Sequence, residues 1–267
     1  MIARRSAAAL VLGLVACGPP GASNSSPERP YLGTVVVWSN DVGFTVRAPL
    51  ATPSARAASC PSSAVGGCVV RACLPEPPPV DGATPAFIGA VTVRSGSTLV
   101  PVTLDPAGGY AVVSGNGPLY TPSSLTVAAG GDLAYGDFSI TLPPPPNLVY
   151  AVPGESAGEV VLDRARDFAI AWAKAAGDAE AELRVVARGD GESVTSMVCT
   201  APVSAGALVV PAAAIAALPP SGSDRARTLT LSLTTVVARA ATLSSGERLS
   251  VRAERQPPRQ RANVVVR

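Results

Sequence analysis

The sequence predicts an all-β protein made of two tandem β-sandwich domains. Hydrophobic residues make up 47% of the chain and charged residues only 15%, a composition that supports a folded core rather than disorder. Apolar and polar side chains alternate in many short runs, which is the period of a half-buried strand. The 25 glycines and 27 prolines separate these runs and favour turns over long helices.

Alternating runs recur through residues 31–142. Val35 and Val37 precede a turn at 39–41, and an alternating run follows it, which predicts a hairpin. The runs after the turn are Phe44/Val46, Val91/Val93, Val102/Leu104, Leu125/Val127 and Phe138/Ile140/Leu142. Glycine-rich turns lie between several of these runs, so we expect residues 31–142 to form the first sandwich.

Four consecutive prolines at 143–146 interrupt the pattern. Proline cannot enter the interior of a sheet and favours an extended chain, so residues 143–155 are expected to link two domains. The second sandwich is then expected over residues 156–267. Its alternating runs are Phe168/Ile170/Trp172, Leu183/Val185, Leu229/Leu231/Leu233 and a last strand at Val264–Val266.

Two features of this second half refine the prediction. Trp172 is in phase with Phe168 and Ile170, which predicts a core tryptophan as in immunoglobulin-like sandwiches. An alanine-rich segment begins with Pro211, and Pro219 stops it, so a short helix is expected near residues 211–218.

The first thirty residues predict export and a lipid anchor. A positively charged start precedes an apolar run at 7–16, about ten residues long, whereas a membrane-spanning helix needs about 20. Leu14–Cys17 is similar to the lipobox of bacterial lipoproteins, in which the cysteine is lipidated. We therefore expect a signal peptide at 1–16, a lipid on Cys17 that binds the membrane, and a flexible tether over 17–30.

The residue after Cys17 predicts the final location. Gly18 stands there instead of aspartate. In Gram-negative lipoproteins this pattern implies sorting to the outer membrane. The expected location is therefore the cell envelope, with the protein anchored to the outer membrane.

Several segments resemble uncharacterised lipoproteins of myxobacteria. The similar segments are GCVVRAC at 67–73, the stretch 108–127, LDRARDFAIAW at 162–172, and the region 199–218. The resemblance covers most of residues 60–220. It implies lipoproteins with immunoglobulin-like β-sandwich domains, and it implies no activity, because the family has none to carry over.

The four cysteines beyond the leader predict disulfides. Cys60, Cys68, Cys73 and Cys199 are an even number in an exported chain. On one strand Cys68 and Cys73 lie about 16 Å apart, which is too far to bridge. Cys60 is therefore expected to pair with one of them. The other either bonds Cys199, which would join the two domains, or stays free.

The composition argues against most catalytic chemistry. The chain has no histidine, the usual base of hydrolases and the commonest metal ligand. It carries no phosphate-binding or dinucleotide motif, and a net charge of +2 gives no bias toward nucleic acid. The acids mostly fall at turns and are interpreted as solvated. The alternating acids Asp178, Glu180 and Glu182 would suit calcium, but no glycine-centred loop with a final bidentate acid follows them, so this cluster is interpreted as solvated too. We therefore expect no enzyme, no cofactor, no metal and no nucleic-acid partner.

Three functions are compatible with these observations. The leading hypothesis is a non-catalytic structural, adhesive or accessory-binding role, with an envelope protein or a polysaccharide as the partner. The alternative is a carbohydrate-binding module on the cell surface, with Trp38 and Tyr120 as the exposed aromatics that stack on sugar rings. The second alternative is a carboxylate-dependent hydrolase, which requires two acids in one cleft.

Overall fold

A computed structural model of the protein describes residues 31–51, 60–73, 84–105, 108–120, 124–132, 134–152, 159–190, 193–257 and 261–267. These residues form an all-β, sandwich-like fold with three sheets and one α-helix, α1 (Ala212–Ala216). Within them, no helix is long and apolar enough to cross a bilayer. The predicted signal peptide, Cys17 and the tether lie outside the described residues.

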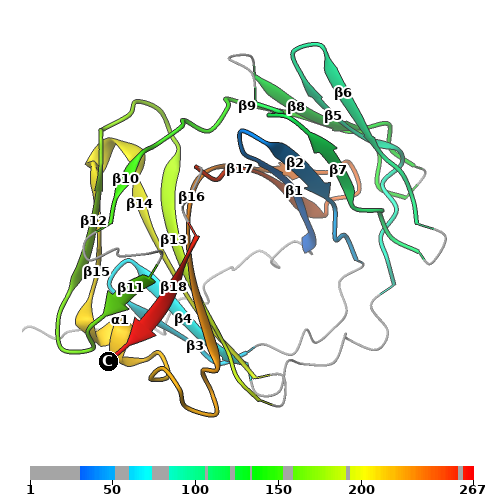
Figure 1. Ribbon diagram of the computed structural model, residues 1–267. Coiled ribbons are helices and arrows are strands. Elements are labelled where there is room, and N and C mark those ends of the chain that lie inside the picture. The colour runs from blue at the N-terminus through cyan, green and yellow to red at the C-terminus, as the bar shows by residue number, and fades with distance from the viewer. Residues whose placement is uncertain are drawn as a thin grey trace, which may run out of the picture.

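The largest sheet contains eleven strands. Nine of them follow in the order β3 (Ser62–Val65), β4 (Cys68–Cys73), β14 (Val194–Pro202), β13 (Glu180–Arg188), β16 (Thr228–Thr242), β17 (Arg248–Arg255), β1 (Tyr31–Ser39), β2 (Gly43–Arg47) and β7 (Val113–Asn116). The strand β18 (Arg261–Val266) also pairs with β16, and β11 (Glu159–Leu162) pairs with β18. Figure 1 shows that this large sheet is curved, with β13 and β14 on one side and β1 and β2 on the other.

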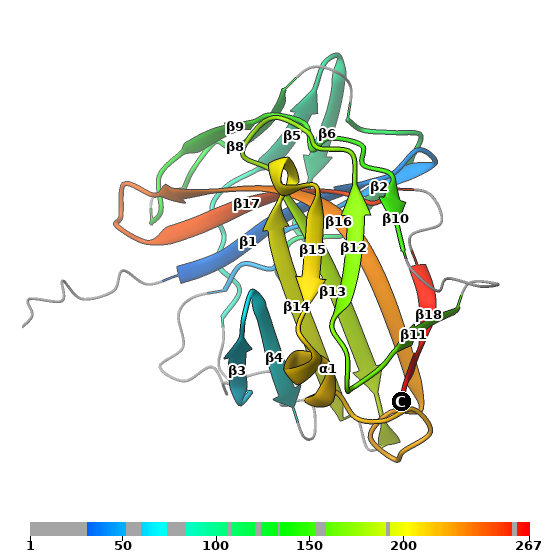
Figure 2. The same ribbon diagram turned by 90° about the vertical axis from the view of Figure 1, so that its left-hand side faces the viewer.

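Two smaller sheets cover the convex side of the large sheet (Figures 1 and 2). One has four strands in the order β6 (Thr98–Val102), β5 (Val91–Ser95), β8 (Leu125–Ala129) and β9 (Phe138–Leu142). The other has three strands in the order β10 (Tyr150–Ala151), β12 (Phe168–Trp172) and β15 (Ala207–Val210). The hydrophobic core lies between the large sheet and these two covers.

Strand alternation decides which side chains enter that core. On β13, Leu183 and Val185 are fully buried, whereas Arg184 between them is exposed on the opposite face. The prediction for Trp172 is confirmed, because its side chain is buried and its Nε1 donates to the carbonyl oxygen of Val203 at 2.8 Å. Most of the alternating runs predicted from the sequence thus become strands with their apolar side inward. Leu104 is an exception, because it lies beyond the end of the strand Thr98–Val102 and its side chain is 47% exposed.

The large sheet contains strands from both sides of the domain boundary expected at residues 143–155. β4 pairs with β14, and β1 runs parallel to β17, so strands from both sides of the prolines share one sheet. Pro145 and Leu148 are themselves buried, so this segment packs against the fold. Alternation predicts the face of each side chain, but the choice of neighbouring strand depends on packing between distant segments.

Two disulfides join the four predicted cysteines. Cys60 bonds Cys73, and Cys68 bonds Cys199, which confirms the pairing of Cys60 with one of its two neighbours. Cys68 and Cys199 are directly opposite on β4 and β14. The second bond therefore links neighbouring strands of one sheet rather than two separate domains.

The short helix is also confirmed, with one difference. Pro211 is the residue before the helix, and α1 begins at Ala212. The helix has five residues, so it is shorter than the segment 211–218 expected from the sequence.

Candidate functional site

The concave face of the large sheet is polar. We use this name for the side that carries Trp38, Glu182 and Arg71. Cross-strand register builds the face, because directly opposite residues point to the same side of a sheet. Glu182 on β13 is opposite Thr234 on β16, and Trp38 on β1 is opposite Glu254 on β17. Neither of the smaller sheets covers this side (Figure 1).

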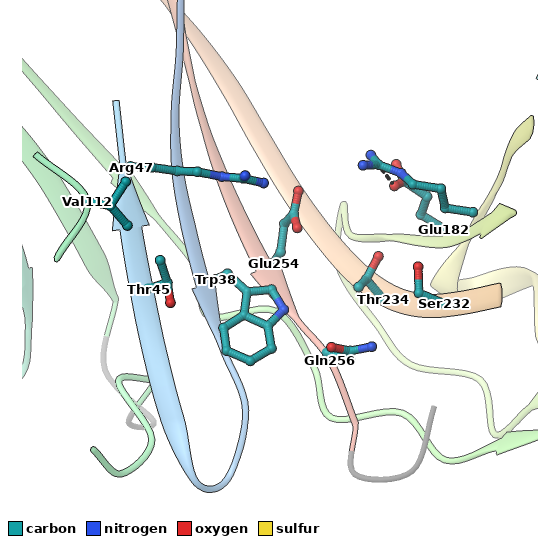
Figure 3. A pocket seen from close by; sticks show the side chains of 10 residues that line it. Trp38, Thr45, Arg47, Val112, Glu182, Ser232, Thr234, Glu254 and Gln256 are labelled. Atoms are coloured by element: carbon teal, nitrogen blue, oxygen red, sulfur yellow. Dashed lines mark hydrogen bonds and ion pairs between the residues drawn. The ribbon is translucent and has the colours of Figure 1, made fainter. Parts of the chain in front are cut away.

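A pocket of about 380 Å³ opens on this face. Strands β1, β2, β13, β16 and β17 supply most of its walls. Its polar and aromatic lining includes Trp38, Thr45, Arg47, Ser232, Thr234 and Gln256. Figure 3 shows these side chains together with two carboxylates, Glu182 and Glu254, in the same pocket.

Trp38 supplies the aromatic surface of the pocket. Its side chain is only partly buried, although the neighbouring residues Val37 and Ser39 are buried on the opposite face. Thr45 lies directly across the strand pair β1–β2 from the indole. An accessible aromatic face beside hydroxyl and amide groups can contact both the apolar faces and the hydroxyls of a sugar. Trp38 is thus accessible in the pocket, and its stacking on a sugar ring stays a prediction.

Tyr120 does not share this environment, so its assignment as an exposed stacking residue is wrong. Its side chain is 5% exposed, and its hydroxyl donates to the carbonyl oxygen of Val37. The guanidinium of Arg255 lies 5.4 Å from the ring centroid, and burial raises the pKa of the hydroxyl. A tyrosine from a polar loop can be buried in this way because a backbone carbonyl satisfies its hydroxyl.

A buried carboxylate organises the charges at the pocket. Glu182 is 4% exposed and accepts hydrogen bonds from Arg252 at 2.7 Å and from Arg184 at 3.0 Å. Arg252 also donates through Nε to Glu254. Burial alone would lower the pKa of Arg252, but the charges and hydrogen bonds of both glutamates outweigh it and raise the pKa. These four residues form one connected ionic network across β13 and β17.

The sequence interpretation missed Glu182, which it had assigned to a solvated cluster. A signal was present in the alternation of β13, where Glu182 and Arg184 alternate with Leu183 and Val185. Residues two apart on a strand share a face, so an acid and a base at this spacing predict an ion pair on the polar side. The pair Arg252 and Glu254 on β17 has the same spacing.

A second pocket, of about 520 Å³, continues along the concave face toward β4. Glu182 and Arg184 line both pockets. The second pocket adds Arg71 and Arg188 to the polar lining, together with aliphatic side chains from β14.

Among the residues that the structure describes, no group of three or more histidine, cysteine, aspartate or glutamate side chains is placed to hold a metal ion.

A comparison with known protein families and a comparison with curated proteins each found no match to this sequence.

Proposed function

We propose that this protein is a non-catalytic, lipid-anchored protein of the outer membrane that binds a polysaccharide on the concave face of its large sheet. The observation that carries the proposal is the Trp38 pocket, an accessible indole surrounded by hydroxyl, amide and charged groups. This choice joins the envelope role expected from the leader to the carbohydrate-binding alternative.

The polar lining supports a sugar rather than an apolar ligand. Thr45 and Gln256 offer donors and acceptors near the indole, and Ser232 and Thr234 offer more of them farther along the same pocket. A sugar ring presents an apolar face to an aromatic side chain and hydroxyls at its edge, so it uses both kinds of group together.

The lipid anchor and the immunoglobulin-like character belong to the same proposal. The lipobox-like Leu14–Cys17 supports the anchor. The buried side chain of Trp172 supports an immunoglobulin-like core. The mass of the intact protein extracted from host membranes tests the anchor. The expected mass begins at Cys17 with acyl chains added, and a mass that retains residues 1–16 contradicts it.

A hydrolase is the second candidate, because Glu182 and Glu254 share one pocket. Two carboxylates in a cleft are the minimum that a glycosidase needs. The carboxylate oxygens of both glutamates, however, accept hydrogen bonds from Arg252 or Arg184. A general acid must instead direct its proton to the substrate. Release of new reducing ends from a bound polysaccharide, lost in Glu254→Gln, would establish the hydrolase and overturn the non-catalytic proposal.

A polysaccharide pull-down tests the binding function. The full chain is incubated with a panel of immobilised polysaccharides, and the bound fraction is compared with that of Trp38→Ala. Phe87→Ala is the matched control, because Phe87 is 39% exposed and stacks on Tyr110 away from the pocket. We expect Trp38→Ala to lower the affinity at least tenfold and Phe87→Ala to leave it unchanged. Equal retention of all three proteins would contradict the proposal.

A further inference from the structure

We infer that the polysaccharide bound by the concave face is acidic, and that it extends from the Trp38 pocket across the sheet to Arg71 and Arg188. This inference rests on the proposed function and adds the chemical class of its ligand.

The two pockets form one continuous track. They share Glu182 and Arg184, and together they cross the neighbouring strands β4, β14, β13, β16, β17, β1 and β2. At about 4.8 Å between strands, these seven strands span about 29 Å along the curved surface. A track of this length fits an extended polymer better than a single small molecule.

Positive charge is in excess along the track. The two pockets are lined by five arginines and two glutamates, a net charge of +3. Arg184 and Arg252 are neutralised by Glu182 and Glu254. The three remaining arginines, Arg47, Arg71 and Arg188, form no ion pair within the described part of the chain.

The spacing of these three arginines favours repeated charges on the ligand. Arg71 is opposite Ser196 on β14, and Ser196 is opposite Val186, two residues before Arg188 on β13. Arg71 and Arg188 therefore approach the track from strands about 10 Å apart. Arg47 lies beyond Trp38 on β2, at the opposite end. One compact anion cannot reach both ends, whereas a polymer with an acid on each repeat can.

Arginine is well suited to recognise such acids. Its planar guanidinium donates two parallel hydrogen bonds to a carboxylate, and it keeps its charge at every physiological pH. The paired Arg184 and Arg252 hold Glu182 in place between the two pockets, so this central carboxylate is screened from the ligand. Repulsion of an acidic polymer by Glu182 is thereby reduced.

The test compares two polymers with the same sugar backbone. Polygalacturonate carries a carboxylate on each sugar, and its highly methyl-esterified form is nearly neutral. Affinity of the full chain for each is measured by calorimetry at low and high salt. The variants are Arg71→Gln/Arg188→Gln, Arg47→Gln and Trp38→Ala, and the control is Arg94→Gln, an exposed arginine of β5 outside both pockets.

We expect polygalacturonate to bind at least tenfold more tightly than its ester, and salt to weaken only the binding of the acid. Each variant that removes a track arginine should lower the affinity for the acid about tenfold or more, because a hydrogen bond to a charged group is lost. Arg94→Gln should change neither polymer. Circular dichroism of each variant verifies that it is folded.

The other outcomes separate this inference from the proposed function. Equal binding of both polymers, lost in Trp38→Ala and unaffected by the arginine variants, would overturn the acidic ligand and leave sugar binding intact. Tight binding of poly-L-glutamate that needs the arginines but not Trp38 would assign the track to an acidic peptide and overturn both. Binding of neither polymer would also overturn both.

Discussion

Removal of the Cys68–Cys199 disulfide is expected to destabilise the protein more than removal of Cys60–Cys73. The two bonds span 131 and 13 residues along the chain. A cross-link stabilises mainly by restricting the denatured state, and the effect grows with the logarithm of the loop length. The long loop corresponds to about 5 kcal/mol and the short loop to about 3 kcal/mol. The difference of about 2 kcal/mol depends only on the ratio of the two lengths.

The burial of the Cys68–Cys199 bond adds a second contribution to the loss of stability. Cys68 and Cys199 are 1% and 0% exposed, so their replacement by alanine also removes buried sulfur atoms. Cys68→Val with Cys199→Val fills much of that volume and separates the packing loss from the loss of the cross-link.

Equilibrium unfolding in urea measures both effects. The double variants Cys68→Val/Cys199→Val and Cys60→Ala/Cys73→Ala are compared with the native chain by circular dichroism. The free energy of unfolding is fitted together with its urea dependence, since loss of a cross-link expands the denatured state and raises the slope. An equal or larger loss of stability in the Cys60/Cys73 variant would refute this reasoning.

Two further predictions concern buried polar groups. Glu182→Gln should lower the free energy of unfolding by about 2 kcal/mol, because the charge-assisted bonds from Arg184 and Arg252 are weakened, and urea unfolding with no change would contradict the network. Tyr150→Phe should cost about 1 kcal/mol at neutral pH through the lost bond to Thr235. Burial raises the pKa of Tyr150 from 10.0 to about 12, so its protonated form favours the folded state. That stabilisation is complete below pH 10 and disappears as the pH rises to 12. The Tyr150→Phe variant should therefore lose less stability than the native chain as the pH rises over this range. An equal loss in both proteins would contradict the role given to Tyr150.

Local features of this fold were predictable from the sequence because they depend on neighbouring residues. The alternation of Phe168, Ile170 and Trp172 predicted which side enters the core, and the structure buries all three. The spacing of Cys68 and Cys73 excluded a bond between them, since five residues of strand hold the sulfur atoms too far apart.

Features that depend on distant segments were not predictable in this way. The proline run at 143–146 suggested a division between two domains, yet β4 pairs with β14 across it. The concave face arises only after that pairing, because it combines side chains from both halves of the chain. Trp38 could be selected as an exposed aromatic, but nothing local revealed that Glu182 and Arg252 would meet beside it. Tyr120 shows the converse error. It was selected as exposed, but its side chain is buried and its hydroxyl donates to the carbonyl oxygen of the distant Val37.

The fluorescence of Trp38 during titration with a polysaccharide tests the central claim most directly. The chain has two tryptophans, and Trp172 is buried in the core, so a ligand on the concave face should change the emission of Trp38 alone. We predict a saturable shift to shorter wavelength that is absent in Trp38→Phe. Calorimetric binding of the same polysaccharide without any change in tryptophan emission would place the site elsewhere and contradict this account.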